Sequence, residues 1–514
     1  MLGWLTLLLL WELAGQAKWV GDGALPAPSE VFLQLWIDRS DYPAHIWGTV
    51  KTSLAGFLIG NLIAILAGFV FVLLPSAQRL MSGINVTLFA MPAIALVPIL
   101  VIALQGDSPR VVLAAVSVYF PSMMATVLGL TQVDPRLPDV VRVSGGGAWA
   151  VLRFIRIRNG LPTLLSGLRV AAPAAVLGSL LAEFGSGGSA GLGTYLIGSL
   201  GRAEPARLWG IGLVATAISG MAYVLVDLVA HRFAGDTISV STPVGRHEST
   251  ESESVWSRWS IACLALLMPF LFWWLMVLLF RSMDVSDVVL RTPLGVLDHL
   301  FMTDNASENL QRLGSALAET LPLTVIGMLA GLAVAFTLAV LTLLWPALGR
   351  TLLPISLVTQ SMPLVALTPL VVLVFGRDLS GILVVTVSVT FFPAFVTMAQ
   401  GLALVPQTIQ DLIRAYGGGR WRQLQKIAIP WSVPYLCAAA RLAAPRAFLG
   451  VMIAEWLATG TGVGNLLNES RGILDFGMIW SVSVTAIVIA VTLNSLVVVI
   501  EKNLLKRYTT NTTT

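Results

Sequence analysis

The amino-acid sequence predicts an all-α, polytopic helical membrane protein with about twelve transmembrane helices, arranged as two parallel six-helix repeats. Three observations support this fold class. Of the 514 residues, 56% are hydrophobic and only 11% are charged, whereas a soluble domain carries about 25% charged residues. The chain divides into apolar stretches of about 18–25 residues, the length that crosses a bilayer as a helix. The two halves of the chain also resemble each other.

The apolar segments form two sets of six. The first set lies near residues 2–17, 48–74, 82–105, 110–131, 162–183 and 207–230, and the second near 259–280, 320–345, 352–375, 380–402, 433–456 and 477–500. We therefore expect a first unit over 1–234, a flexible polar linker over 235–256, a second unit over 257–508 and a disordered tail over 509–514. The first positive residue, Lys18, follows the first apolar run. That order favours a retained helix over the alternative of a signal peptide.

A constant offset of 272 residues relates the two halves. Aligned in this way, Asp139–Glu183 and Asp411–Glu455 are identical at 20 of 45 positions. An even number of helices per unit, with the same topology in both copies, predicts parallel repeats about an axis along the membrane normal. Such an arrangement leaves a pathway between the halves.

Basic residues gather in loops on one side of the predicted helices. The loop after the fourth segment carries Arg136, Arg142, Arg153, Arg156 and Arg158, and the equivalent loop of the second half and the C-terminal region are also basic. Loops on the other side are acidic or mixed. Because cytoplasmic loops carry an excess of Lys and Arg, we expect both long loops, the linker and both termini in the cytoplasm.

The two long basic loops share one pattern: an acidic residue, an arginine, a glycine triplet, a tryptophan and isoleucines near the next helix. Glycine permits backbone conformations that other residues avoid, so we expect a short helix, a sharp break and a second short helix. The second helix is amphipathic, which suits the membrane surface or a groove on a partner. One triplet alone would favour a flexible surface loop, whereas its occurrence twice in the same context favours a docking role. The candidate docking residues are Asp139, Arg142, Gly145, Gly146, Gly147, Trp149, Ile155 and Ile157 in the first half, and Asp411, Arg414, Gly417, Gly418, Gly419, Trp421, Ile427 and Pro430 in the second.

This pattern resembles the EAA coupling loop of ABC importer permeases. Asp139 and Asp411 occupy the place of the glutamate that this family usually has. Ile429-Pro430 stands for the family's Leu-Pro, whereas the first half has Arg158 at the proline position. The glycine-rich sequences 191–193 and 462–464 are similar to the nitrate, sulfonate, taurine and bicarbonate branch of these permeases. The resemblance implies a type I importer fold with two permease units fused in one chain.

The resemblance also implies a function and partners. It implies a permease subunit that moves a small solute, either a sulfonate- or nitrate-like anion or a vitamin precursor, delivered by a separate extracytoplasmic binding protein. Two copies of a cytoplasmic ABC ATPase would dock on the loops. ATP and Mg would bind to that ATPase, with no cofactor in this chain, in the plasma membrane of a prokaryote. Arg158 predicts that the first half engages its ATPase differently from the second.

Charged residues within the predicted helices are a second set of candidates. Arg169 and Arg441 lie near the cytoplasmic end of the fifth segment of each half, and Glu183 and Glu455 lie near its outer end. Charges in a membrane segment are costly and often functional. A role in a pathway or gate is one interpretation. A structural ion pair or a solvated helix end is the other.

Other classes of function lack support in the sequence. The chain has no Gly-x-x-x-x-Gly-Lys-Ser/Thr phosphate loop, so we expect a transport subunit rather than an enzyme. The scattered histidines and two cysteines favour no metal site, and the dispersed basic residues favour no nucleic acid. The alternative is a twelve-helix secondary transporter driven by an ion gradient. It would be expected to carry acidic or histidine relays inside the membrane.

Overall fold

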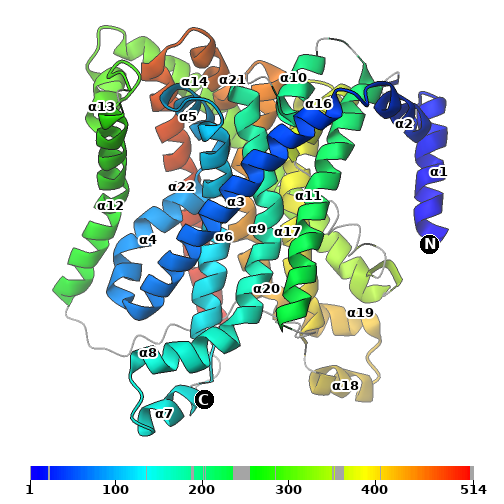
Figure 1. Ribbon diagram of the computed structural model, residues 1–514. Coiled ribbons are helices and arrows are strands. Elements are labelled where there is room, and N and C mark those ends of the chain that lie inside the picture. The colour runs from blue at the N-terminus through cyan, green and yellow to red at the C-terminus, as the bar shows by residue number, and fades with distance from the viewer. Residues whose placement is uncertain are drawn as a thin grey trace.

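The computed structural model describes residues 2–20, 23–134, 136–186, 190–200, 202, 204–234, 255–283, 285–345, 347–349, 352, 364–405 and 407–509. Every regular element in these ranges is a helix (Figure 1). Most of the predicted linker, residues 235–254, lies outside the described residues. So do residues 510–514 of the predicted tail.

The described residues of the first half form eleven α-helices, arranged around one long loop. They are α1 (Leu2–Gln16), α2 (Pro28–Ile37), α3 (Tyr42–Leu73), α4 (Pro75–Ala90), α5 (Ala93–Ala103), α6 (Ser108–Thr131), α7 (Arg136–Val143), α8 (Ala148–Val151), α9 (Ile157–Ser186) and α10 (Leu192–Leu200), followed by the closing helix α11 (Pro205–Ala234). A π-helical turn over Leu152–Arg156 joins α8 to α9.

The second half repeats this order. Its described helices are α12 (Val255–Ser282), α13 (Pro293–Phe301), α14 (Ala306–Leu344), α16 (Leu364–Phe375), α17 (Leu379–Ala403), α18 (Gln407–Ala415), α19 (Arg420–Gln423), α20 (Ile429–Ala454), α21 (Gly462–Gly472) and α22 (Phe476–Thr509). A π-helical turn over Leu424–Ala428 joins α19 to α20, as in the first half, and another over Glu455–Thr459 follows α20.

Eight of the predicted segments are unbroken helices long and apolar enough to span a membrane: α3, α6, α9, α11, α14, α17, α20 and α22, with the loop helices extending two of them. The segment predicted over 82–105 is instead bent by 96° between α4 and α5. Pro92 lies at this bend and has no backbone N–H to continue the helix. α1 has 15 residues, about 22 Å, which is short of a bilayer core. The segment over 352–375 is described as a helix only from α16 onward.

Small residues bring equivalent helices into close contact in each half. In α3, Gly56 and Gly60 face α6, and a Cβ at Gly60 would lie 2.5 Å from the carbonyl oxygen of Ala115. In α14, Gly327 and Gly331 face threonines of α17 in the same way. Each pair is a Gly-x-x-x-Gly sequence, which lets helix backbones approach in lipid.

The two halves exchange equivalent contacts. α5 of the first half packs against α20 and α22 of the second, and α16 of the second half packs against α9 and α11 of the first. Ser483 of α22 donates a hydrogen bond of 2.7 Å to the carbonyl oxygen of Ala95 in α5. This reciprocal exchange indicates a pseudo-two-fold relation, in which the contact between the halves is built around α5 and α16.

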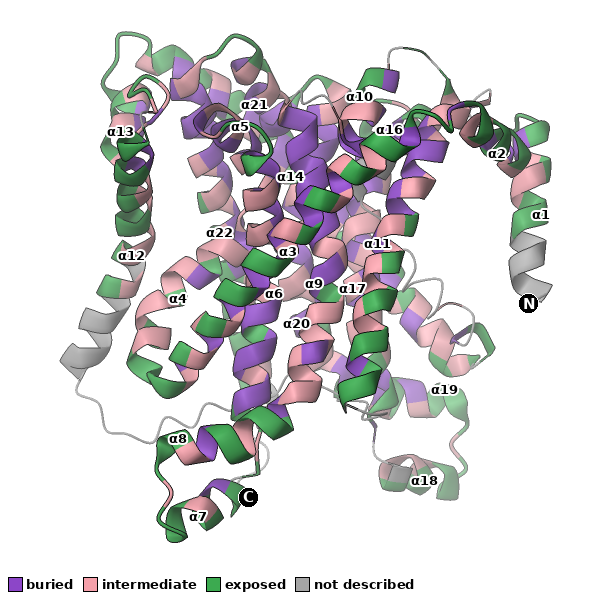
Figure 2. Ribbon diagram, viewed as in Figure 1, coloured by how far each residue is buried: buried purple, intermediate pink, exposed green. Residues whose placement is uncertain are grey.

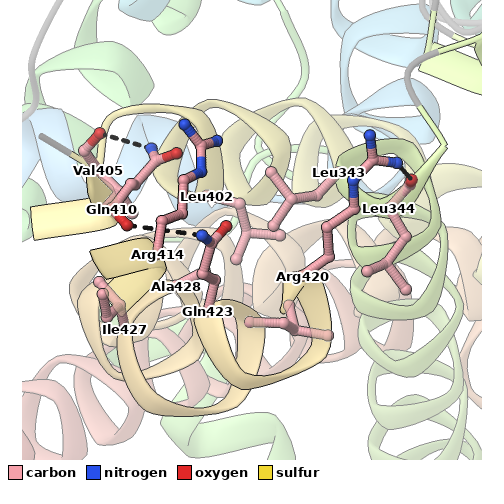
Figure 3. Close-up of a pocket in the computed structure, with 11 residues that line it drawn as sticks. Leu343, Leu344, Leu402, Val405, Gln410, Arg414, Arg420, Gln423, Ile427 and Ala428 are labelled. Carbon is pink, nitrogen blue, oxygen red and sulfur yellow. Dashed lines mark hydrogen bonds between the residues drawn. The ribbon is translucent and has the colours of Figure 1, made fainter. Parts of the chain in front are cut away.

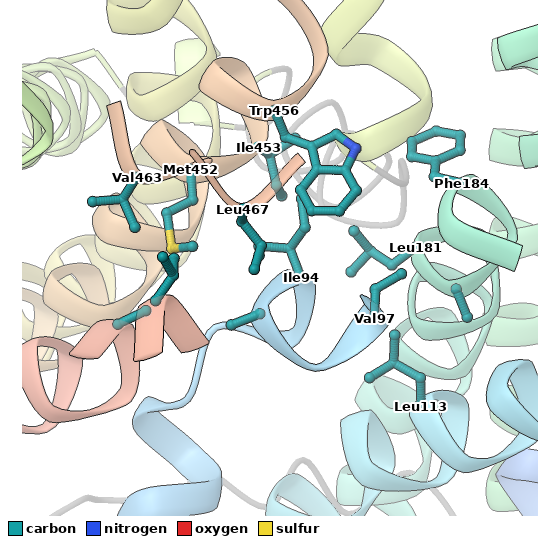
Figure 4. Packing of buried hydrophobic residues seen from close by; sticks show 14 of the residues in the cluster. Ile94, Val97, Leu113, Leu181, Phe184, Met452, Ile453, Trp456, Val463 and Leu467 are labelled. Atoms are coloured by element: carbon teal, nitrogen blue, oxygen red, sulfur yellow. The ribbon is translucent and has the colours of Figure 1, made fainter. Parts of the chain in front are cut away.

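The largest buried cluster joins the halves. It includes Ile94 and Val97 of α5, Leu181 of α9 and Ile453 of α20, which lie close together in Figure 4. Buried residues gather toward the end of the bundle away from α7, α8, α18 and α19, whereas those loop helices are largely exposed (Figure 2). The halves are therefore held together by apolar packing at the end opposite the long loops.

Candidate functional site

The first long loop has the predicted helix, break and helix. α7 ends at Val143, and Gly145 has a φ of +83°. The N–H of Gly145 donates to the carbonyl of Arg142 at 3.0 Å, and the N–H of Gly146 donates to the carbonyl of Val141 at 2.9 Å. These bonds satisfy carbonyls at the helix end, where glycine most easily adopts a left-handed conformation. The chain then turns into α8 and runs through the π-helical turn into α9.

The second loop repeats this geometry. Gly417 has a φ of +73° and donates to the carbonyl of Arg414 at 2.9 Å, and Gly418 donates to the carbonyl of Ile413 at 2.8 Å. α18 and α19 project from the same end of the bundle as α7 and α8 (Figure 1). Both loops therefore have the same glycine break, as the sequence predicts.

The three glycines of each triplet differ in what they require. The first needs a positive φ, as described above. The second has no room for a side chain, because a Cβ at Gly418 would meet Ile413, including its backbone oxygen at 2.9 Å. The third, Gly419, has an extended backbone and nothing within 4 Å of a Cβ. The same three environments occur at Gly145, Gly146 and Gly147.

The charged and aromatic candidates lie on the exposed surface of these loops. Asp139 pairs with Arg142 at 3.1 Å, and Asp411 pairs with Arg414 at 3.2 Å, both between exposed side chains one helical turn apart. Such surface pairs contribute about 0–1 kcal/mol. Trp149 and Trp421 are 65% and 59% exposed. An exposed tryptophan at the same place in both loops is available for contact with another surface.

The isoleucines and the Arg158/Pro430 pair lie where the loops enter the long helices. Ile155 and Ile427 are half-buried within the two π-helical turns, and Ile157 begins α9. Pro430 lies in the first turn of α20 and is exposed, a position where its missing N–H is not needed. Arg158 is exposed at the equivalent position of α9. The predicted difference between the two loops is therefore a difference between exposed side chains.

A pocket lies behind each loop. In the second half it has a volume of about 220 Å³ and lies between α18, α19 and the end of α14 (Figure 3). Arg420 donates to the carbonyl of Leu344 at 3.4 Å, and Gln423 donates to the carbonyl of Gln410 at 3.5 Å. In the first half a pocket of about 370 Å³ is lined by Asp139, Arg142 and Arg156, among others. Arg420 thus ties the second loop to the end of α14, and Gln423 joins the two helices of the loop.

The structure places Glu183 and Glu455 in identical buried networks at the opposite end of the bundle. Glu183 accepts hydrogen bonds from the Thr49 hydroxyl and the Gly193 N–H, both at 2.7 Å. The Thr49 hydroxyl in turn accepts from the N–H of Leu192 at 2.9 Å. The carboxylate therefore accepts one free N–H at the start of the short helix α10, and the Thr49 hydroxyl accepts its neighbour.

In the second half, Glu455 accepts from the Thr320 hydroxyl at 2.7 Å and from the Gly464 N–H at 2.9 Å. Thr320 accepts from the N–H of Val463 at 2.9 Å. Three elements of each half meet at these carboxylates: α3, α9 and α10 in the first, and α14, α20 and α21 in the second. We call each of these the Glu–Thr network.

Arg169 and Arg441 both pair with a carboxylate on the last helix of their own half. Arg169 lies 3.0 Å from Asp227 of α11, and Arg441 lies 3.5 Å from Glu501 of α22. The sequence does not identify these partners, because they lie about 60 residues away. A pathway role for the four charged candidates remains a prediction, and their contacts are those of structural ties.

Thr49 and Thr320 are the residues that the sequence analysis missed. They are related by an offset of 271, as are Gly56 and Gly327. An alignment extended upstream of Asp139 would have found both. Among the described residues, no group of three His, Cys, Asp or Glu side chains is placed to hold a metal ion.

Comparison with known proteins finds one family twice in the chain. The model of the family described as "Binding-protein-dependent transport system inner membrane component" matches residues 60–237 and again residues 327–510. No solved structure matches the chain.

Curated relatives are similar to parts of the chain. The riboflavin transport system permease protein of Chloroflexus aurantiacus is 28% identical over 31% of this chain and 59% of its own length. A probable ABC transporter permease of Haemophilus influenzae is 26% identical over 44% of this chain and 93% of its own length. The putative aliphatic sulfonates transport permease of Bacillus subtilis is 27% identical over 29% of this chain and 53% of its own length. The match thus spans somewhat more than half the length of the riboflavin and sulfonate permeases.

Proposed function

Because this chain belongs to the family of binding-protein-dependent transport system inner membrane components, we propose that it forms the complete membrane pathway of an ABC importer. The two halves take the places of two permease units, and solute passes between them. One observation carries the proposal: two exposed loops of the same geometry project from the same end of the bundle (Figure 1).

These loops are suited to receive force from a partner. Each is short, is fixed at its glycine break by two backbone hydrogen bonds, and continues without interruption into α9 or α20. A push on α8 or α19 is therefore transmitted along a helix that reaches the contact between the halves. We propose that two cytoplasmic ATPase subunits, which bind ATP and Mg, dock there, one on each loop.

We also propose the other partners and the orientation. A separate binding protein on the outer side delivers a small solute, either a sulfonate- or nitrate-like anion or a vitamin precursor. The basic loops and both termini face the cytoplasm, by the excess of Lys and Arg in the loops. The membrane is the plasma membrane of a prokaryote. Relatives named for sulfonate and riboflavin transport support both solute classes.

Co-purification with an ATPase tests the proposal. The chain is expressed with a candidate ABC ATPase from the same organism, solubilised and captured by a tag on the permease alone. We expect the ATPase to be retained, with binding-protein-stimulated ATP hydrolysis in nanodiscs. Trp421→Ala should weaken retention by about tenfold, because aromatic side chains at an interface often contribute more than 1 kcal/mol.

Trp345 provides a matched control for Trp421. It is 55% exposed but lies at the end of α14, outside the loop helices. Trp345→Ala should leave ATPase retention unchanged. If the wild-type chain retains no ATPase, or if both tryptophan variants behave alike, the proposed coupling role is wrong.

A further inference from the structure

Arg446 is a charged residue in the middle of a membrane-spanning helix. It lies in α20, within the spanning segment Arg420–Leu457. Arg441, five residues earlier, pairs with Glu501. Among the residues that the structure describes, none forms a hydrogen bond or ion pair with Arg446. Because an unpaired charge within a membrane is costly, such a residue commonly marks a route for solutes or ions.

The face of α20 that carries Arg446 is the face turned toward the other half. Ile453 lies seven residues later, which is two helical turns, and so shares that face. Ile453 belongs to the buried cluster with Ile94 and Val97 of α5 (Figure 4). Leu449 also packs against that cluster. Arg446 therefore lies about 10 Å nearer the coupling loops than Ile453, next to the contact between the halves.

The repeat shows that the fold does not require this arginine. Its equivalent in α9 is Ala174, and both residues follow a proline, Pro173 or Pro445. The neighbours on this face are otherwise matched, because Leu177 and Leu181 of α9 pack against the same cluster as Leu449 and Ile453. The ion-paired arginines 169 and 441 occur in both halves. Arg446 occurs only in the second half, because its equivalent in the first half is Ala174.

We propose that Arg446 binds the oxyanion group of the transported solute between the two halves. This inference rests on the proposed importer function and selects one of its two solute classes: a small anion with a sulfonate, carboxylate or nitrate-like group. A guanidinium presents a planar fork of N–H donors that matches two oxygens of such a group. Away from bulk water, that charge-assisted pair is stronger than it is in solution. The bound anion would also compensate the positive charge within the membrane.

Ligand-induced stabilisation of the full chain tests the inference. The purified protein in nanodiscs of zwitterionic lipid is unfolded by heat in sodium ethanesulfonate, nitrate or bicarbonate. Sodium chloride at equal ionic strength and uncharged riboflavin serve as reference solutes. We expect at least one oxyanion to raise the Tm of the wild type in a saturable way. Its dissociation constant should be weaker by about tenfold or more in Arg446→Ala, as for the loss of a charged hydrogen-bond partner.

Three variants sharpen the result. Arg446→Ala should fold, because the first half has alanine at this position, and Arg446→Gln provides a second neutral variant. Arg446→Lys should bind the oxyanion with intermediate affinity, because an ammonium keeps the charge but lacks the planar fork. Arg281→Ala is the control: it removes an arginine from an exposed ion pair with Asp287 at the end of α12 and should leave oxyanion affinity unchanged.

The outcomes separate this inference from the proposed function. Stabilisation by riboflavin alone, by no oxyanion, or equally in wild type and Arg446→Ala overturns the inference, as does an equal loss in Arg281→Ala. ATPase retention is measured on the same samples. Its failure in the wild type refutes the importer function, whereas its persistence in Arg446→Ala shows that any loss of oxyanion binding arises in the pathway.

Discussion

The glycine triplet of the second long loop gives a prediction that distinguishes three adjacent positions. Gly417→Ala places a Cβ on a residue with φ +73°, and the left-handed conformation costs an L-residue about 1–2 kcal/mol. If the loop must keep this shape to bind the ATPase, the fraction in the binding shape falls by about 5- to 30-fold, and the apparent affinity falls with it. Gly418→Ala should be at least as damaging, because its Cβ would meet backbone atoms of Ile413.

Gly419→Ser is the matched control for both changes. Its backbone is extended, no atom lies within 4 Å of a Cβ, and serine is a favourable residue at the start of a helix. We expect ATPase affinity within about twofold of wild type, since surface substitutions of this kind change stability by about 0.5 kcal/mol or less. The assay is titration of the permease in nanodiscs with purified ATPase subunit.

Bundle stability is measured beside affinity. The loop lies outside the packed spanning helices, so the Tm of the bundle should be the same for all three variants. Equal losses of affinity in Gly419→Ser and Gly417→Ala would refute the reasoning, because they would show that the loop is sensitive to any side chain rather than to backbone shape.

Further predictions concern the end of the bundle opposite the long loops. Glu455→Ala leaves the Gly464 N–H without its acceptor and leaves the Thr320 hydroxyl only the carbonyl of Ala316, at 3.0 Å. At about 1–3 kcal/mol for one buried group without a partner, we expect the free energy of unfolding to fall by roughly 1–3 kcal/mol. Glu455→Gln keeps one acceptor oxygen, so its free energy of unfolding in chemical denaturation should fall by less. Equal losses in the two variants would contradict the stabilising role of the Glu–Thr network. Arg207 donates two hydrogen bonds of 2.7 Å to Asp38 and holds the pKa of that buried carboxyl below its usual value. This pair should therefore stabilise the fold fully above about pH 4 and lose that effect as the pH falls through the lower pKa of the folded state. Asp38→Asn should lower the Tm at pH 7 and flatten its dependence on acid pH; an unchanged acid profile would contradict this assignment.

The sequence predicted the features that depend on local pattern. Hydropathy located all eight of the unbroken spanning helices, because twenty or so apolar residues have few alternatives to a membrane helix. The glycine triplets predicted the breaks in the loops, because a positive φ is a local requirement. The coupling role of these loops stays a prediction that the binding experiments address.

Features that depend on how helices cross were not predictable in this way. The partners of Arg169 and Arg441 are set by the packing of α9 on α11 and of α20 on α22, which no local pattern specifies. Short helices such as α10 and α21 have too few apolar residues to stand out in hydropathy. The bend at Pro92 could be predicted as a kink, but its size of 96° depends on the contacts of α5 with the other half.

The fusion of the two halves means that positive side chains along the proposed pathway need not occur in pairs. When two identical chains assemble, every side chain on the wall occurs twice, so cations are added in pairs that repel each other across a narrow space. A fused chain has no such constraint. At the equivalent positions 174 and 446, this chain has one alanine and one arginine, and so a single cation rather than a pair. The Arg446 guanidinium then neutralises one monovalent anion, and no second cation at the equivalent position slows the release of that anion.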